Sequence, residues 1–206
     1  KGWTGMKYKE AGVDIDKGLE SVKRIKAHVK KTFSKNVISD IGAFGAMYSG
    51  AFDMKDPVLV SSADGVGTKL IIAQKTGYFD NVGADIVNHS IDDILCIGAK
   101  PLYFLDYIGA GKIEPDVIET IIASMSAACC DAGMSLIGGE MAEMGAVYNY
   151  EHYDIVGFIT GIADRESIIT GSEIHEGDSI IGLKSSGFHT NGFSLVRAII
   201  DEAGID

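Results

Sequence analysis

The chain has 206 residues, enough for one medium-sized domain or for one domain and the beginning of another. Its content of 46% hydrophobic and 23% charged residues excludes a disordered or fibrous chain. The net charge of −11 argues against a nonspecific nucleic-acid binder and against a membrane-surface protein, because both use cationic fields. Glycine is unusually frequent, with 26 residues, or about 13% against roughly 7% in ordinary chains, which suggests backbone turns that approach a ligand closely.

The cysteines and the apolar segments bear on the cellular compartment. The three cysteines are Cys96, Cys129 and Cys130, an odd number with two adjacent, so we expect reduced thiols and no disulfide framework or zinc site. The first residues lack the apolar core of a signal peptide, and no stretch is long and apolar enough to span a membrane. We therefore expect a soluble, cytoplasmic protein with no membrane partner.

The first half of the chain predicts two helices around one strand. Residues 17–33 carry apolar side chains at helical spacing and predict an amphipathic helix. A glycine-rich stretch follows, and the β-rich run 57–63 predicts a buried strand. That strand ends at the turn 64–69, after which residues 70–77 predict a helix closed by a glycine.

The second half alternates helices and strands. We expect helices at 82–97 and 116–133, and strands at 102–110, 134–138 and 153–163. Residues 176–200 then predict a strand, a Gly/Ser loop and a final helix. The pattern is that of a mixed α/β protein with a domain boundary near the loop at 164–178.

Three predicted junctions between a strand and a loop combine glycine with polar or charged residues: 64–69, 138–140 and 185–192. Glycine lets backbone N–H groups turn toward an anion, and the N-terminus of a following helix adds positive potential. The first junction also offers Lys69 to a phosphate, although its DGVGTK sequence is not a Walker A loop. Taken alone, this turn is equally consistent with a purely structural role.

Acidic residues point toward a cation. On the helix at 82–97, Asp85, His89, Asp92 and Asp93 recur at spacings that place them near one face. This face is either simply solvated or neutralised by a cation. The junctions at 64–69 and 138–140 add the carboxylates of Asp64 and Glu140. Oxygen ligands of this kind, with substrate phosphates, suit Mg²⁺.

His189 is the histidine most suited to a functional role. It stands in the sequence SSGFHTNG, a loop of small polar residues before a predicted helix. There it could bind a substrate phosphate or assist a proton transfer, or be an ordinary loop histidine.

Five motifs in order resemble one enzyme family. They are YKEAGVDIDKG, DPVLVSSADGVGTKL, IGAKPLYFLDYIGAGKI, GGEMAEM and SSGFHTNGFSLVR, and they extend from about Tyr8 to Arg197. Together they resemble the phosphoribosylformylglycinamidine cyclo-ligase family, also called aminoimidazole ribonucleotide synthetase. The resemblance implies a ligase of purine biosynthesis that uses ATP and Mg²⁺. Its nucleotide substrate is formylglycinamidine ribonucleotide, which is activated as an iminophosphate and closed to aminoimidazole ribonucleotide, with release of ADP and phosphate.

The resemblance also assigns roles to individual residues. It implies catalytic roles in phosphate or substrate binding for Lys69, His189 and Asn191. It implies nucleotide binding by Lys26, Gly42, Gly45, Asp64, Gly65, Gly67, Thr68, Lys69, Gly138, Gly139 and Glu140. It implies Mg²⁺ coordination by Asp64, Asp85, Asp93 and Glu140. The chain departs from the family pattern at Asp92, Met141, Gly145 and the pair Gly109-Ala110, where the family usually has other residues.

The resemblance further implies an α/β (α+β mixed) fold in two domains. Residues 1–168 would form an N-terminal ATP-binding domain that dimerises into a barrel of sheets, and residues 169–206 would begin a second α/β domain. We expect a homodimer, with the nucleotide near the domain and subunit boundary. Since family members are considerably longer, we expect this chain alone to fold and dimerise but to catalyse poorly.

Two other interpretations remain open. One is a related enzyme that shares the arrangement of the ATP site. It would be of the formylglycinamidine ribonucleotide synthetase, selenophosphate synthetase or thiamine-monophosphate kinase type. The other is a non-catalytic module that binds a nucleotide or dimerises.

Overall fold

The computed structural model describes residues 13–42 and 44–205. The elements in chain order are α1 (Ile15–Lys31), β1 (Pro57–Gly65), α2 (Lys69–Thr76), α3 (Val82–Leu95), β2 (Lys100–Ala110), α4 (Pro115–Asp131), β3 (Ser135–Glu143), β4 (Tyr153–Asp164), a 3₁₀ turn (Arg165–Ser167) and α5 (Phe193–Ala203). This is a mixed α/β arrangement, as the alternation of patterns predicted.

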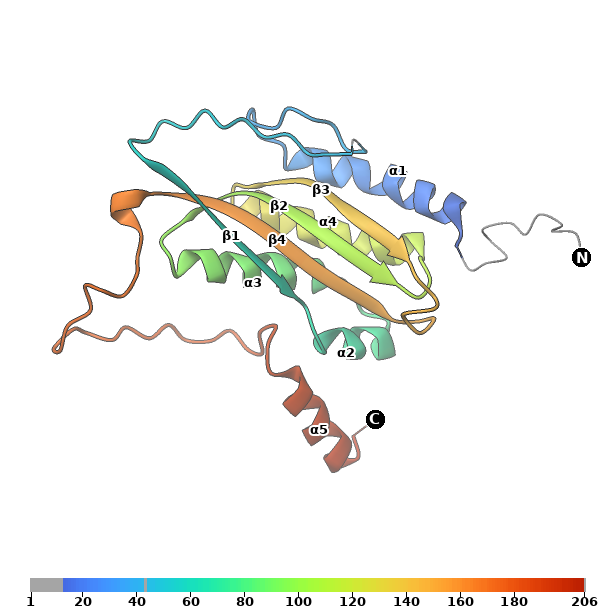
Figure 1. The fold of residues 1–206 in the computed structure, drawn as a ribbon. Coiled ribbons are helices and arrows are strands. Elements are labelled where there is room, and N and C mark those ends of the chain that lie inside the picture. The colour runs from blue at the N-terminus through green and yellow to red at the C-terminus, as the bar shows by residue number, and fades with distance from the viewer. Residues whose placement is uncertain (1–12, 43, 206) are drawn as a thin grey trace, which may run out of the picture.

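The four strands form one sheet in the order β1-β4-β2-β3 (Figure 1). β4 is antiparallel to both of its neighbours, whereas β2 and β3 are parallel and are joined through α4. The last strand in the chain therefore lies between the first two, and β1 and β3 form the two edges of the sheet.

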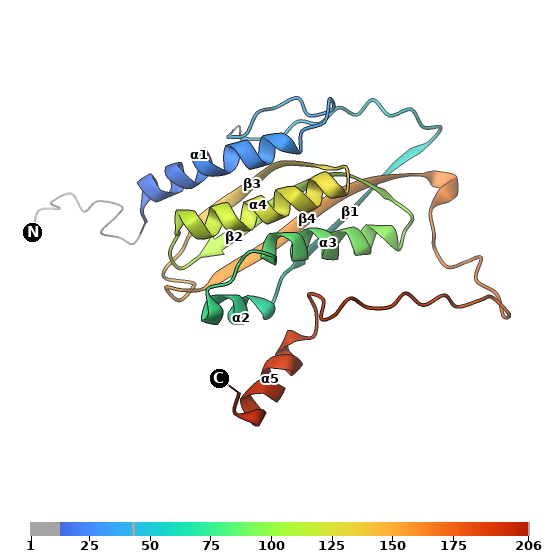
Figure 2. The same ribbon diagram turned by 180° about the vertical axis from the view of Figure 1, so that it is seen from behind.

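Helices cover one face of the sheet. α3 and α4 lie across it, and α1 packs beside α4 near the β3 edge (Figure 2). The core between these layers consists largely of fully buried aliphatic and aromatic side chains, among them Ile86, Phe104, Ile118 and Ile159. No helix of the described residues covers the other face, which is turned toward the viewer in Figure 1. We call this uncovered surface the open face.

Capping and turn residues set the helix bounds. The Asp14 side chain accepts a hydrogen bond from the Lys17 N–H and caps α1. Pro115 occupies the first turn of α4, as predicted, where its missing N–H is harmless. Gly77 ends α2 with φ +70°, a conformation that favours glycine.

One glycine lets two helices approach closely. A Cβ atom built on Gly83 of α3 would lie 2.0 Å from the carbonyl oxygen of Ile121 and 2.6 Å from the backbone nitrogen of Met125, both on α4. The absence of a side chain at Gly83 therefore sets the distance between α3 and α4.

The expected strand within residues 176–200 is not formed, which corrects one prediction. Residues 168–192 contain no strand, and Ile180 and Leu183 are almost fully exposed. A strand needs a partner to pair its backbone groups, and this segment is paired with none of the four strands of the sheet. The final helix was predicted correctly and is α5.

Among the described residues, no helix is both long and apolar enough to cross a bilayer.

Candidate functional site

The turn predicted after the first strand leads from β1 into α2. Its backbone is fixed to β4 because the Val66 N–H donates to the carbonyl of Ile155 at 2.9 Å. Gly67 has φ +70°, the left-handed region that favours glycine, whereas Gly65 has an ordinary conformation with room for a side chain. Thr68 is the N-cap of α2. The turn thus presents the N-terminus of a helix beside Asp64, the arrangement expected for phosphate binding.

Asp64 is hydrogen-bonded through both of its carboxylate oxygens. Oδ1 accepts from the Gly65 N–H at 2.7 Å, and Oδ2 lies 2.6 Å from Nε2 of His89 on α3. The hydrogen bond from His89, and then that from Gly65, holds the pKa of Asp64 below its ordinary value. Asp64 is therefore ionised at neutral pH, and about half of its side chain is exposed to solvent.

Lys69 is neutralised within the chain. Its Nζ lies 2.5 Å from Oδ2 of Asp85, one turn before His89 on α3, and 5.3 Å from the centre of the Phe193 ring. Only about one fifth of each charged side chain is exposed. The ammonium group predicted to meet a phosphate is thus partly enclosed and already paired with a carboxylate.

Asp93 is the third residue on this face of α3, after Asp85 and His89, that contacts a neighbouring segment. Its Oδ2 accepts a hydrogen bond from the Ser62 hydroxyl at 2.5 Å. Asp85, His89 and Asp93 are spaced four residues apart and all contact β1 or the start of α2, whereas Asp92 is exposed. The predicted shared face is therefore confirmed for three of its four residues, and it is packed against β1 rather than simply solvated.

The loop predicted to bind substrate reaches the same region. Thr190 is buried, and its hydroxyl lies 3.4 Å from the backbone carbonyl of Asp85. Ser194 of α5 shares a 3.0 Å hydrogen bond with the hydroxyl of Thr68. His189 and Asn191 flank Thr190 in the sequence, and both are exposed; Nε2 of His189 lies 3.3 Å from the Ser185 hydroxyl.

A second group of predicted residues lines a cavity at the other edge of the sheet. This cavity, of about 1450 Å³, lies between α1, α4, β2, β3 and the segment 38–52, and it extends to Leu59 of β1 and Phe158 of β4. It is lined by five of the residues assigned to nucleotide binding: Gly42, Gly45, Gly138, Gly139 and Glu140. Nζ of Lys26 lies 3.4 Å from Oδ2 of Asp40, a lining residue whose pKa is lowered to about 2, mainly by the hydrogen bond from Lys30.

The junction expected at Gly138–Glu140 lies within β3, which corrects a second prediction. The strand continues to Glu143, with Gly139 paired to Asp106 and Glu140 paired to Tyr107 on β2. Pairing with β2 extends the strand through two glycines that were expected to end it. The Glu140 carboxylate is exposed and accepts a hydrogen bond from the Met141 N–H.

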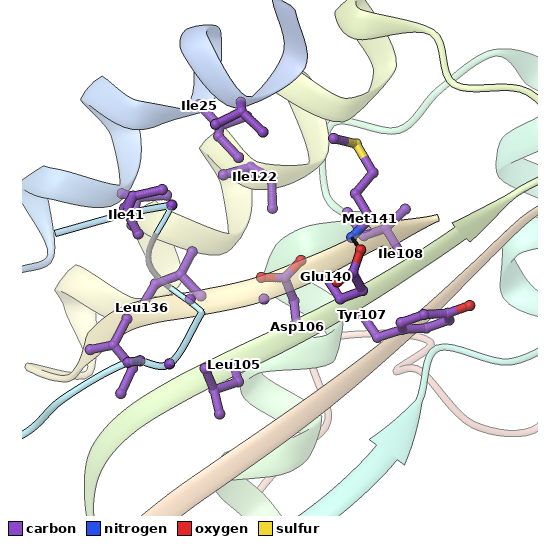
Figure 3. A pocket seen from close by; sticks show the side chains of 18 of the residues that line it. Ile25, Ile41, Leu105, Asp106, Tyr107, Ile108, Ile122, Leu136, Glu140 and Met141 are labelled. Carbon is purple, nitrogen blue, oxygen red and sulfur yellow. Dashed lines mark hydrogen bonds between the residues drawn. The ribbon is translucent and has the colours of Figure 1, made fainter. Parts of the chain in front are cut away.

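Asp106 is an acidic residue in this cavity that the sequence reasoning missed. In Figure 3 it points with Ile108 from β2 toward α4, whereas Leu105 and Tyr107 point to the other side of the sheet. It keeps some accessible surface because the cavity opens beside it, but burial, together with the charge of Glu140, raises its pKa to about 7. The available signal was a carboxylate within the apolar strand sequence LYFLDYIGA.

The predicted acidic residues thus form two groups. Asp64 lies on β1 and Glu140 on β3, with β4 and β2 between them; three strand spacings correspond to roughly 14 Å. In the described part of the chain, no group of three or more His, Cys, Asp or Glu side chains could by itself hold a metal ion. Carboxylate oxygens such as those of Asp64 and Asp93 are nevertheless the donors that Mg²⁺ takes, one or two at a time, while phosphate oxygens and water complete its shell.

Comparison with known proteins identifies a matching family and similar proteins. The family described as "AIR synthase related protein, N-terminal domain" matches residues 49–163. The chain is also 49% identical, over 200 residues, to "Phosphoribosylformylglycinamidine cyclo-ligase" of Staphylococcus aureus strains JH9 and Newman. These alignments cover 97% of this chain and 58% of each relative, so the chain spans somewhat more than half of their length.

A solved structure supports the fold. Thiamine-monophosphate kinase from Stenotrophomonas maltophilia K279a is similar with a TM-score of 0.56 and 16% identity, over 73% of this chain and 43% of that one. At this identity the likeness concerns the fold alone. The family match and the five ordered motifs agree, and we conclude that the chain belongs to the AIR synthase related family and carries its N-terminal domain.

Proposed function

We propose that the protein containing this chain is an ATP-dependent cyclo-ligase of purine biosynthesis. It would convert formylglycinamidine ribonucleotide to aminoimidazole ribonucleotide and release ADP and phosphate. The observation that carries this proposal is the 49% identity, over 97% of the chain, to relatives named phosphoribosylformylglycinamidine cyclo-ligase. The organisation of the turn after β1 supports it.

In the proposed reaction the protein has to position the substrates and neutralise charge, and it does not have to supply a nucleophile. The substrate's amide oxygen takes the γ-phosphoryl group, and its own amidine nitrogen then displaces phosphate as the ring closes. Lys69 would bind phosphate oxygens from the start of α2, where the N-terminus of the helix adds positive potential. Its pairing with Asp85 would keep the ammonium group in place before the nucleotide binds.

The carboxylates would hold the magnesium ion of the nucleotide. Asp64 is ionised and half exposed, and Asp93 is held by Ser62 on the same side of β1. Bound Mg²⁺ would neutralise charge on the transferring phosphoryl group. Asp85 is committed to Lys69 in this structure, so we assign Asp64 and Asp93 as the primary ligands on this edge.

We also propose a homodimer that forms through the open face. Leu59 of β1 and Phe158 of β4 are large apolar side chains on this face, with 57% and 42% of their surfaces exposed. Exposed apolar area of this kind is typical of an interface. If two such sheets close into a barrel, sheet edges of the two copies meet. The residues that line the cavity and the carboxylate of Asp64 would then both lie near the subunit boundary, where we expect the nucleotide.

The decisive experiment uses the purified full-length protein. We expect ATP-dependent formation of aminoimidazole ribonucleotide from formylglycinamidine ribonucleotide, with ADP release, and loss of at least 100-fold in kcat/KM for Asp64→Asn. Parallel reactions contain formylglycinamide ribonucleotide with glutamine, selenide, or thiamine monophosphate. ATP consumption with one of these substrates alone would assign the protein to a sister enzyme.

A further inference from the structure

His89 is a largely buried side chain in contact with the proposed phosphate site, and no role has so far been assigned to it. Only 13% of its side chain is exposed, and its ring lies between α3 and the end of β1. Nε2 lies 2.6 Å from Oδ2 of Asp64. Because an ionised carboxylate only accepts hydrogen bonds, the proton of this bond belongs to His89 Nε2.

The bond leaves Asp64 able to bind a ligand. Each carboxylate oxygen can accept about two hydrogen bonds or metal contacts, and each uses one within the protein, from Gly65 and from His89. With 49% of its side chain exposed, Asp64 directs its remaining capacity to solvent. Two fixed contacts on different oxygens also hold the carboxylate plane in one orientation, as a preformed site requires.

The helix that carries His89 is itself held firmly against the sheet. Ile86 and Ser90, on the buried side of α3, have no exposed surface. One turn on either side of His89, Asp85 binds Lys69 and Asp93 binds Ser62. Because α3 is held in this way, the hydrogen bond from His89 also restricts the movement of the Asp64 side chain. Without that bond, the side chain would be held only from the end of its own strand, β1.

We propose that His89 is a positioning residue, which fixes the Asp64 carboxylate in the orientation that receives the cation of a magnesium nucleotide. This inference rests on the proposed function, since it takes Asp64 as a ligand of that cation. His89 would contact neither the metal nor the substrate. Loss of hydrogen-bonding partners of metal ligands typically weakens metal binding 10–100-fold.

The test compares side chains that keep or lose the bond. Gln at position 89 places an amide nitrogen close to the site of Nε2, Asn is polar but too short, and Leu fills the space without a donor. His28 of α1 provides the matched control, because it is a partly buried histidine whose Nε2 lies 3.6 Å from a carboxylate oxygen of Glu119 on α4. The full-length protein is used for wild type, His89→Leu, His89→Asn, His89→Gln, His28→Leu and Asp64→Asn.

The main readout is the affinity for a non-hydrolysable ATP analogue with Mn²⁺, measured by calorimetry and by the electron paramagnetic resonance signal of free Mn²⁺. Thermal unfolding of each variant is measured alongside. We expect Asp64→Asn, His89→Leu and His89→Asn to bind the Mn²⁺ complex at least tenfold more weakly. His89→Gln should stay within threefold of wild type, and His28→Leu should be unchanged.

The outcomes separate this inference from the proposed function. If Asp64→Asn loses affinity while folded His89→Leu and His89→Asn bind like wild type, His89 has a structural role at most and the inference is wrong. If His89→Leu does not fold, the contrast between His89→Asn and His89→Gln decides, and equal affinities overturn the proposal. If the wild-type protein does not bind the Mn²⁺ complex, the proposed function fails and the inference fails with it.

Discussion

Gly139 and Asp106 show at the scale of single residues why a glycine stands in the middle of a strand. They are paired on β3 and β2, and a Cβ atom on Gly139 would lie 2.3 Å from Oδ1 of Asp106 and 2.7 Å from its carbonyl oxygen. The glycine was predicted from its motif to approach a nucleotide. The structure adds a second reason, since only glycine leaves room for the neighbouring carboxyl group.

Replacement of Gly139 should therefore be costly even without ligand. We expect Gly139→Ala to lower the free energy of unfolding by about 1–3 kcal/mol, because the new methyl group meets backbone as well as side chain. Gly138→Ala is the control: its Cβ would lie 3.3 Å from a flexible Leu105 methyl group, which can move. Urea denaturation measures both, and equal stabilities for the two variants would contradict the steric argument.

Asp106 should make stability depend on pH. Burial raises its pKa in the folded state from 3.8 to about 7, so the folded protein favours the protonated carboxyl group. The contribution of Asp106 to the free energy of unfolding is fully present below pH 4 and is lost as pH rises through 7. The full displacement of its pKa corresponds to at most about 4 kcal/mol. Asp106→Asn removes the ionisation. We expect the variant to gain stability relative to wild type between pH 4 and pH 9.

Denaturation at several pH values checks this expectation. The informative quantity is the difference between the free energies of unfolding of Asp106→Asn and wild type, because other titrating groups cancel in it. A difference that does not change with pH would show that Asp106 ionises without penalty.

At the scale of elements, helix packing distinguishes glycines that look alike in the sequence. Gly18 of α1 and Gly83 of α3 both lie inside predicted helices. A Cβ on Gly18 meets nothing within 4 Å, whereas a Cβ on Gly83 would collide with the backbone of α4. Helical propensity governs the first position, and the contact between two helices governs the second.

Replacement of these two glycines by alanine should change the stability of the protein in opposite directions. We expect Gly18→Ala to stabilise the protein by about 0.5–1 kcal/mol, through the higher helix propensity of alanine and its less flexible unfolded chain. Gly83→Ala should destabilise it by about 2 kcal/mol or more, because α3 and α4 must move apart. Thermal unfolding of both variants tests the pair, and a stabilised Gly83→Ala variant would contradict the observed packing.

At the scale of the whole molecule, the open face of the sheet is covered by no helix of the described residues. α3 and α4 cover one side of the sheet (Figures 1 and 2), while Leu59 and Phe158 extend from the other. A second copy of the same sheet would bury these side chains, which is the basis of the proposed dimer.

A charge on the open face should break that dimer. We expect Phe158→Lys to convert a dimer to a monomer in light scattering coupled to size-exclusion chromatography, because the interface would have to bury an unpaired ammonium group. Ile180→Lys serves as control, since Ile180 is fully exposed and lies outside the sheet. A Phe158→Lys variant that stays dimeric would place the interface elsewhere.

The sequence by itself determined the main helices and the family. Helical spacing, Pro115 and Gly77 predicted the main helices to within a few residues, and five ordered motifs indicated the family. These signals are local, because helix periodicity, caps and turns depend on neighbours along the chain. The shared face of Asp85, His89 and Asp93 belongs to the same class, since it follows from spacing on one helix.

Only the tertiary structure decided how the predicted site is distributed. The strand order places β4 and β2 between Asp64 and Glu140, so carboxylates that looked like one cluster lie on opposite edges of the sheet. The partnership of Asp106 with Gly139, the extension of β3 through its glycines, and the bond from His89 to Asp64 likewise depend on contacts between distant segments. Strand order and register are set by the burial of whole faces in a common core, and no local pattern records them.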